Sequence, residues 1–183
     1  DKEIQKLSLA VEGTQKEIAA LSERMKEFIP DEERLVFDVY VGMLDGGSLI
    51  DDTIDRIKKG MWAPAALRDT IADHVRAFEN MEDAYFRERA SDVRDLGRRV
   101  LMHLQNDGGD HRKIPKDAIL VGDEISPAQL AEIPRERLKA LVSVRGSATS
   151  HVSILAKALD IPAVLGVHEL PLGLVEGRRM IVD

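Results

Sequence analysis

The sequence predicts a protein of two parts that differ in fold class: a helical part over residues 1–110 and a small α/β part over residues 111–183. Apolar residues three and four apart recur through the first part, as expected for amphipathic helices that pack against antiparallel neighbours. In the second part, short apolar runs alternate with helical patterns, which is typical of an α/β layer. A cluster of helix-breaking residues at 106–110 marks the expected boundary.

The first two helices are predicted from apolar spacing and from one proline. Residues 3–29 form a long apolar seam that only Thr14 interrupts, and Pro30 ends this helix and opens the next. Residues 35–44 are apolar nearly all round and fit a strand as well as a helix. We expect a helix there, because three acids precede the segment where a helix favours negative charge.

Ser48 is predicted to cap a short helix that stops at Gly60, and Pro64 to begin a helix that bends near Asn80 and continues to about residue 104. After the boundary we expect strands over 118–122, 138–144, 163–165 and 179–182, with helices over 126–131 and 149–159. The chain stops within this alternation, so a piece of a longer protein is expected.

Composition limits the class of protein. The 183 residues carry a net charge of −7 and include no cysteine, which excludes a disulfide scaffold, a thiolate metal site and a cysteine nucleophile. No apolar stretch approaches the roughly 20 residues of a membrane span, and no signal peptide opens the chain. The acidic balance disfavours duplex nucleic acid as a partner. We therefore expect a soluble, intracellular protein.

The negative charge is concentrated in one segment. Residues 113–183 hold nine basic and nine acidic side chains, so the whole −7 lies in residues 1–112. Within these, residues 26–55, which we call the acidic segment, hold nine acids against Lys26 and Arg34. Composition alone leaves two interpretations open: a solvated face that keeps the protein soluble, or a docking surface for a basic partner.

His151 is the histidine whose neighbours favour chemistry. It lies in the first turn of a predicted helix, where free N–H groups and the helix dipole favour an anion and disfavour an imidazolium. Nearby residues supply hydroxyl donors or leave room for an incoming group: Gly146, Ser147, Thr149, Ser150 and Ser153. These features suit a neutral histidine that accepts a phosphoryl group. A structural histidine at a helix start is the alternative.

The other four histidines are expected to be surface or structural residues: His74, His103, His111 and His168. No pair of them has the spacing of a zinc site, and no glycine-rich loop has the form of a P-loop or a dinucleotide fingerprint. We expect no metal site in this chain.

Two motifs resemble a known family. Residues 146–166, GSATSHVSILAKALDIPAVLG, resemble the phosphohistidine signature of the phosphoenolpyruvate-utilising enzymes, and within them that of enzyme I of the bacterial phosphotransferase system. Residues 83–99, DAYFRERASDVRDLGRR, resemble a second signature, on the last long helix of the carrier-binding subdomain. The stretch 62–68, with Ser147 and Val152, is more similar to the nitrogen-related enzyme I than to the sugar enzyme. The resemblance covers nearly the whole chain.

The resemblance implies a fold and a reaction. The fold would be a four-helix-type subdomain of two antiparallel hairpins joined to an α/β phosphohistidine subdomain, both ends being shorter than in the full enzyme. His151 would take a phosphoryl group from phosphoenolpyruvate held by a separate C-terminal domain and pass it to a histidine of an HPr-like (NPr) carrier. Mg²⁺ would be needed with that domain and not in this fragment. The enzyme would act in the cytoplasm, in nitrogen regulation.

The resemblance also implies site residues. Positions that would support His151 are Gly146, Thr149, Ser150, Ser153 and Lys157. Positions that would contact the carrier are Asp31, Glu32, Tyr40, Met43, Leu49, Arg89 and Arg94. Arg89 falls on an apolar stripe of its helix, so an internal pair with Asp92 or Glu88 is an equal alternative to carrier contact.

The chain departs from the family pattern at four positions. Ser147 replaces a glycine of the sugar enzymes, Val152 a hydroxyl residue and Lys157 an arginine, and Leu130 stands where the family has a hydroxyl. Which hydroxyl orients His151 therefore stays open. Two rival functions also stay open: the swivelling domain of a pyruvate phosphate dikinase relative, which the helical part disfavours, and a non-catalytic helical adaptor.

Overall fold

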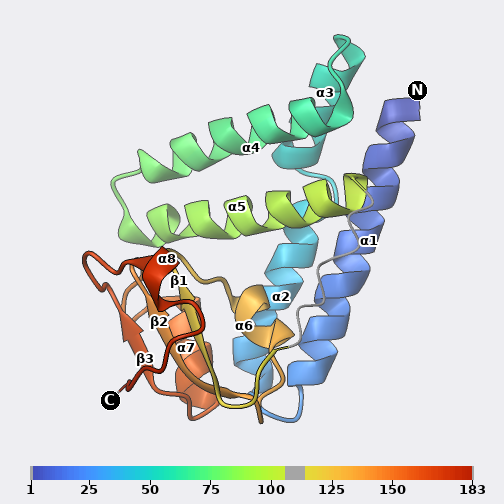
Figure 1. The fold of residues 1–183 in the computed structure, drawn as a ribbon. Coiled ribbons are helices and arrows are strands. Elements are labelled where there is room, and N and C mark those ends of the chain that lie inside the picture. Colours follow the sequence, from blue (N-terminus) through green and yellow to red (C-terminus); the bar gives the residue numbers. More distant parts are fainter. Residues whose placement is uncertain (1, 106–113, 183) are drawn as a thin grey trace. The chain divides into compact units, whose positions relative to one another are not determined.

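The structure is a computed structural model that describes residues 2–105 and 114–182 (Figure 1). The predicted boundary at 106–110 and His111 lie outside the described residues, as do the side chains of residues 84–86 and 88. The chain divides into two compact units, Asp1–Ala20 with Phe37–His111, and Leu21–Val36 with Arg112–Asp183. The units are considered separately below.

The first unit is helical, as predicted. Its elements are most of α1 (Lys2–Met25), the later part of α2 (Asp31–Leu44), α3 (Ser48–Lys58), α4 (Ala63–Glu79) and α5 (Ala84–Leu104). Its core is built from apolar side chains with no more than 1% exposure, including Leu7, Ile18, Phe37, Leu67, Leu96 and Val100. No helix in the described ranges is long and apolar enough to cross a membrane.

Helix α2 settles the ambiguity of residues 35–44 in favour of a helix. Phe37, Tyr40 and Leu44, three and four apart, are at most 1% exposed and form one buried face. Leu35 and Val39 are 56% and 41% exposed on the remaining surface of the same helix. The apolar residues of this segment therefore lie on two faces of the helix, one buried in the core and one exposed to solvent.

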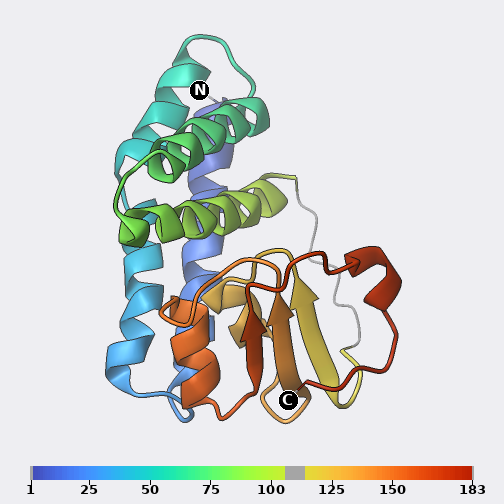
Figure 2. The same cartoon turned by 90° about the vertical axis from the view of Figure 1, so that its left-hand side faces the viewer.

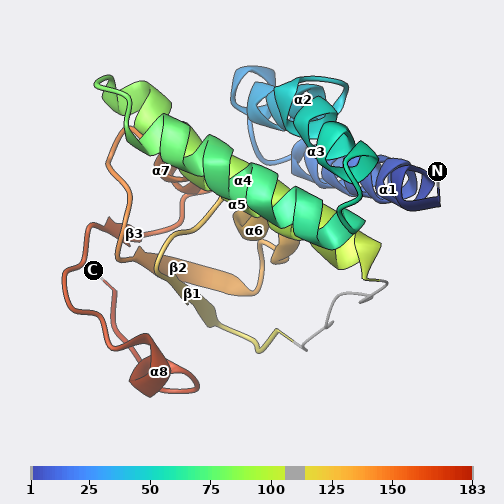
Figure 3. The same ribbon diagram turned by 90° about the horizontal axis from the view of Figure 1, so that it is seen from above.

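Helices α4 and α5 form a hairpin in place of the single bent helix that the sequence predicts. Helix α4 ends at Glu79, and the chain reverses within four residues before α5 begins, so that the two helices lie side by side (Figures 1 and 3). Gly97 permits their close approach, because a Cβ atom there would lie 2.0 Å from Cδ1 of Ile71. The bend prediction near Asn80 was wrong because apolar spacing continues across the turn.

Three helix ends differ from the sequence prediction. Helix α1 ends at Met25, four residues early, and a turn leads on to Pro30. Ser48 is the first residue of α3 and Gly47 is its N-cap. Helix α4 begins at Ala63, whose N–H donates to the Glu3 carboxylate at 3.0 Å. Hydrogen bonds from Lys6 and from this N–H lower the pKa of Glu3 below its usual value.

The second unit contains a parallel sheet whose strands lie in the order β1 (Ala118–Gly122), β2 (Leu138–Ser143), β3 (Ala163–Leu165) (Figure 2). Its helices are α6 (Pro127–Glu132), α7 (His151–Ala158) and α8 (Leu172–Val175). The central strand β2 is the most buried of the three. The predicted α/β layer is thereby confirmed.

The ends of the second unit contain two corrections. Residues 179–182 are not a strand, and α8 was not predicted from the sequence. The start of α6 agrees with prediction, since Ser126 and Gln129 form a reciprocal capping box. Residues 21–36 group with this unit, although a boundary at 110 would place them in the helical part. Within this unit, Arg24 donates to the carbonyl oxygens of Ala131 and Glu132 at 2.8 and 3.2 Å and joins the last residues of α1 to the end of α6.

Candidate functional site

The loop between β2 and α7 leaves the sheet at the carboxyl ends of β1 and β2. Val144 N–H donates to Gly122 O at 3.1 Å and Arg145 N–H to Asp123 O at 2.7 Å, so the first loop residues continue the strand pairing. Gly146 then turns the chain with φ +112, a conformation that favours glycine. This edge is where parallel α/β sheets commonly bind their ligands.

His151 is the first residue of α7 and is half-buried. Ser150 is the N-cap, one residue before it, and its Oγ accepts from the N–H of Ser153 at 3.4 Å. Val152 and Leu155 are at most 5% exposed and anchor the helix in the unit. His151 is therefore carried on a rigid element and remains partly exposed, as a histidine that exchanges a group requires.

Hydrogen bonds order the hydroxyl residues before His151. Ser150 Oγ donates to Ser147 O at 2.8 Å, so its single hydrogen is used within the loop. Ser147 Oγ lies 2.9 Å from Thr149 Oγ1 and accepts from the Thr149 N–H at 3.3 Å. Thr149 is exposed. Ser147 thus contacts both residues that lead into the helix, a role that its sequence position alone did not indicate.

The structure brings together most of the predicted supporting residues. Gly146, Thr149 and Ser150 lie in the loop, and Ser153 lies in the first turn of α7. Lys157 is exposed near the other end of α7, about 9 Å along the helix axis from His151. Leu130 is fully buried in α6. Because leucine has no hydroxyl group, this position cannot orient the imidazole by a hydrogen bond.

The residues predicted to contact a carrier lie in different surroundings. Asp31 and Glu32 are exposed in the first turn of α2, where Asp31 pairs with Arg34 at 2.7 Å. Met43 is half-buried. Leu49 is 5% exposed, so its side chain presents almost no surface to a partner. Leu35 and Val39, which were not singled out from the sequence, are the exposed apolar residues of α2.

Tyr40 is a buried residue that links α2 to α5. Its hydroxyl donates to Asp92 Oδ1 at 2.5 Å, and both side chains are at most 4% exposed. Burial, together with the nearby Asp92 charge, raises the pKa of Tyr40 well above its usual value. Tyr40 therefore has no surface for direct contact with a carrier and acts within the fold.

The two arginines of α5 are paired within the first unit. Arg89 Nη1 lies 3.6 Å from Asp92 Oδ2, with 15% of the arginine side chain exposed, so the internal pair with Asp92 is present. The side chain of Glu88, the other expected partner, lies outside the described residues. Arg94 is 42% exposed and pairs with Glu79 at 2.8 Å.

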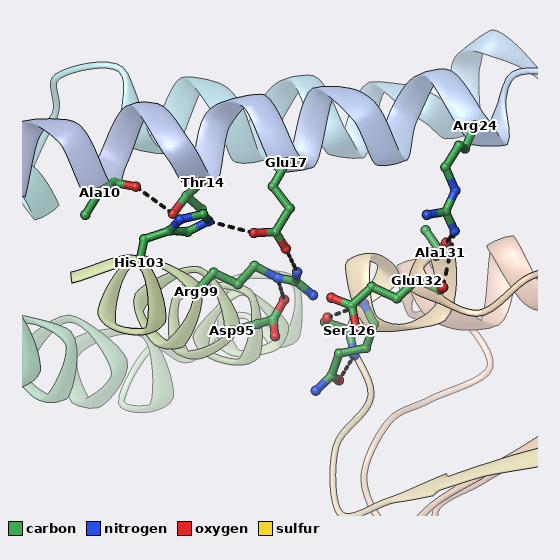
Figure 4. Close-up of polar contacts among 11 residues, drawn as sticks. Ala10, Thr14, Glu17, Arg24, Asp95, Arg99, His103, Ser126, Ala131 and Glu132 are labelled. Atoms are coloured by element: carbon green, nitrogen blue, oxygen red, sulfur yellow. Dashed lines mark hydrogen bonds and ion pairs between the residues drawn. The ribbon is translucent and has the colours of Figure 1, made fainter. Parts of the chain in front are cut away.

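The histidines of α4 and α5 have structural partners. Glu17 of α1 lies 2.9 Å from His103 Nε2 and also accepts from Arg99, whose Nε donates to Asp95 at 2.9 Å (Figure 4). His74 Nε2 lies 2.8 Å from Asp52. Among the described residues, no group of three histidine, aspartate or glutamate side chains could hold a metal ion.

Comparison with protein families covers most of the chain. Residues 1–89 match the family model described as PEP-utilising enzyme, N-terminal, and residues 114–183 match the one described as PEP-utilising enzyme, mobile domain. The first match lies in the helical part of the sequence and the second in the α/β part. The second match includes the loop and the helix that carry His151.

Longer proteins and a solved structure share this similarity. A protein of Escherichia coli (strain K12), named phosphoenolpyruvate-dependent phosphotransferase system, is 34% identical over 99% of this chain and 24% of its own length. A Staphylococcus aureus phosphoenolpyruvate-protein phosphotransferase is 29% identical over 99% of this chain and 32% of its own length. The chain thus spans a quarter to a third of these relatives. The solved N-terminal domain of Enzyme 1 - Nitrogen is 34% identical, with a TM-score of 0.64 over 95% of this chain and 71% of that one.

Proposed function

Because the chain belongs to the phosphoenolpyruvate-utilising enzymes, as the N-terminal part of an enzyme I of the phosphotransferase system, we propose that it carries the phosphohistidine step of that system. The observation that carries the proposal is the position of His151. It begins α7 beside a loop of ordered hydroxyls, within the segment that matches the mobile domain.

In the proposed first step, a ring nitrogen of His151 attacks the phosphorus of phosphoenolpyruvate. The N–P bond forms as the bond from phosphorus to the enol oxygen breaks, and the enolate takes up a proton to become pyruvate. In the second step, a histidine nitrogen of the carrier bonds to phosphorus as the bond to His151 breaks. Since little other covalent chemistry is needed, positioning and charge stabilisation supply most of the catalysis.

Thr149 is the loop hydroxyl best suited to donate to a phosphoryl oxygen. The hydrogen of Ser150 is used by Ser147 O, whereas Thr149 is exposed and can accept from Ser147 Oγ while donating outward. The N–H of Thr149, the Ser147 hydroxyl and the Thr149 hydroxyl would then form one chain of donors, in which each bond polarises the next.

The proposed partner is an HPr-like phosphocarrier, which would dock on α2. The acidic segment supplies the negative charge that a basic carrier surface would meet. Leu35 and Val39, four apart on α2, supply exposed apolar area of the kind that anchors an interface. The nitrogen-type carrier, NPr, is the finer proposal, supported by the similarity to the N-terminal domain of Enzyme 1 - Nitrogen.

Phosphoenolpyruvate and Mg²⁺ are proposed to bind in a C-terminal domain of the same enzyme. Mg²⁺ would neutralise charge on the phosphate and carboxylate of the substrate and is normally held by carboxylates. The described residues of this chain offer no such group of ligands.

We propose that the enzyme works in the cytoplasm, in nitrogen regulation.

The proposal is tested by supplying phosphate from two directions. The purified chain should take phosphate reversibly from a phosphorylated carrier, and faster from the nitrogen-type than from the sugar-type carrier. It should remain unlabelled with phosphoenolpyruvate and Mg²⁺ alone. Failure to acquire phosphate from either carrier would favour a non-catalytic adaptor, and labelling by phosphoenolpyruvate without another protein would show that the donor site is misplaced.

A further inference from the structure

We propose that Asp92 is a positioning residue for carrier docking: together with Tyr40, it holds the Arg89 guanidinium beside α2, where the carrier would meet it. This inference rests on the proposed function, because it presupposes that the chain binds a carrier. It assigns a role to two residues that would touch no partner themselves.

The two oxygens of the Asp92 carboxylate have separate tasks. Oδ1 accepts the Tyr40 hydroxyl at 2.5 Å, and Oδ2 lies 3.6 Å from Nη1 of Arg89. Tyr40 is fully buried in α2 and Asp92 is 4% exposed, so both are fixed by packing. Since Arg89 is three residues before Asp92 on α5, the carboxylate can hold the arginine on the same helix face.

The neighbouring buried charges already have partners on the same helix. Asp95 accepts from Arg99 Nε at 2.9 Å, and Arg99 also donates to Glu17 of α1. Asp92 forms an ion pair with Arg89, and its hydrogen bond to Tyr40 restricts how the carboxylate can turn. At 3.6 Å the contact is an ion pair, and a buried carboxylate restricts the position of the guanidinium charge more than a solvated one would, because fewer side-chain rotamers remain available to it.

Arg89 is the member of this group that reaches the surface, since 15% of its side chain is exposed. The Tyr40–Asp92 contact places it next to α2, whose neighbouring residue Val39 is 41% exposed. Arg89 would place a cation beside α2, which lies within the acidic segment, and a guanidinium recognises an acceptor on a partner, such as a carboxylate or a carbonyl oxygen. Its contribution depends on the direction of the guanidinium, which is what Asp92 and Tyr40 determine.

A double-mutant cycle on carrier affinity tests the inference. Titration calorimetry with the phosphocarrier would compare the wild type with Asp92→Asn, Arg89→Gln and the double variant. Each single change should weaken binding about tenfold, equivalent to about 1.4 kcal/mol, and the double variant should bind no more weakly than Arg89→Gln alone. If Asp92→Asn weakens binding equally with and without Arg89, it acts through the fold and the inference is wrong.

Two further variants distinguish a positioning role from a general effect on folding. Tyr40→Phe keeps the buried ring and removes only the hydroxyl, so it should weaken binding about threefold, again only when Arg89 is present; an equal loss in both backgrounds would overturn the inference. Arg98→Gln, at an exposed position of α5, is the matched control and should bind as the wild type does. A wild type that binds no carrier would overturn the proposed function as well, whereas a binding wild type with an additive cycle overturns this inference alone.

Discussion

At the residue scale, the loop before His151 separates two uses of a hydroxyl group. Ser150 donates to Ser147 O and accepts from the N–H of Ser153, so it stabilises the start of α7. Thr149 contacts the Ser147 hydroxyl and is exposed. The two adjacent hydroxyls should therefore respond differently to removal.

Thr149→Val should slow phosphoryl transfer from the carrier about tenfold, because it removes one donor to the phosphoryl group, and leave thermal unfolding nearly unchanged. Ser150→Ala is the matched variant. It should lower the free energy of unfolding by about 1 kcal/mol through the lost N-cap. Rapid-quench transfer rates and thermal melts of both variants measure this. Transfer by Thr149→Val at the wild-type rate would mean that another group is the donor.

Tyr40 gives the protein a pH dependence in the alkaline range. Burial and the Asp92 charge raise its pKa in the folded chain, whereas in the unfolded chain it ionises near pH 10. Its contribution to stability is therefore present below about pH 10 and is lost as the pH rises further. Urea unfolding between pH 8 and 11 should show a steeper fall for the wild type than for Tyr40→Phe. If the free energy of unfolding falls with pH equally in both proteins, folding does not raise the pKa of Tyr40.

At the element scale, two helical glycines differ in what surrounds them, and substitution should have opposite effects on stability. Gly97 of α5 lies against Ile71 of α4, where a Cβ atom would come within 2.0 Å of Cδ1 and 2.5 Å of Cγ1. At Gly42 of α2, a Cβ atom would have no heavy atom within 4 Å apart from its chain neighbours and the backbone of its own helix. The first glycine sets the spacing between two helices, and the second only weakens its own helix.

Gly97→Ala should destabilise the protein by about 1–2 kcal/mol, because overpacking against Ile71 exceeds the gain in helix propensity. Gly42→Ala should stabilise it by up to about 1 kcal/mol, because only the propensity term applies. Denaturant titrations of both variants give the two signs. Stabilisation by Gly97→Ala would show that α4 and α5 can move apart at little cost.

Sequence patterns predicted the elements whose signals are local. The apolar seam of α1, the capping box at Ser126 and the strand over 118–122 all agree with the structure. The turn between α4 and α5 was missed, because the apolar spacing runs on while tertiary packing reverses the chain. The burial of Tyr40 was also missed, since a tyrosine at helical spacing suits a core and a docking surface equally.

For the candidate site, the sequence predicted His151 and the loop residues around it from one contiguous motif, and the structure places the loop directly before α7. Their role in phosphoryl transfer stays a prediction. The sequence did not identify the role of Ser147, which depends on a turn at Gly146 that brings one hydroxyl against another. Asp92 was likewise considered only as a partner of Arg89, because its bond to Tyr40 spans 52 residues of sequence.

At the scale of the whole molecule, the uneven charge predicts how a carrier should approach. Surface charges act chiefly on the association rate, and salt screens them beyond about 8 Å at physiological ionic strength. Association with the phosphocarrier should therefore slow as salt rises, and Asp31→Lys or Glu32→Lys should slow it at low salt without lowering thermal stability. Stopped-flow measurements at several salt concentrations test this. A rate that is indifferent to salt would mean that the acidic segment is only a solvated face.

Locating the transferred phosphate tests the central claim most directly. The chain would be labelled by a phosphorylated carrier and mapped by mass spectrometry under alkaline conditions, with His151→Ala and, as a matched control, His168→Ala at an exposed position. Acid-labile phosphate should be found on His151 in the wild type and in His168→Ala. His151→Ala should fold normally and carry none. Phosphate on another residue, or wild-type labelling of His151→Ala, would contradict the assignment of His151 as the phosphoryl acceptor.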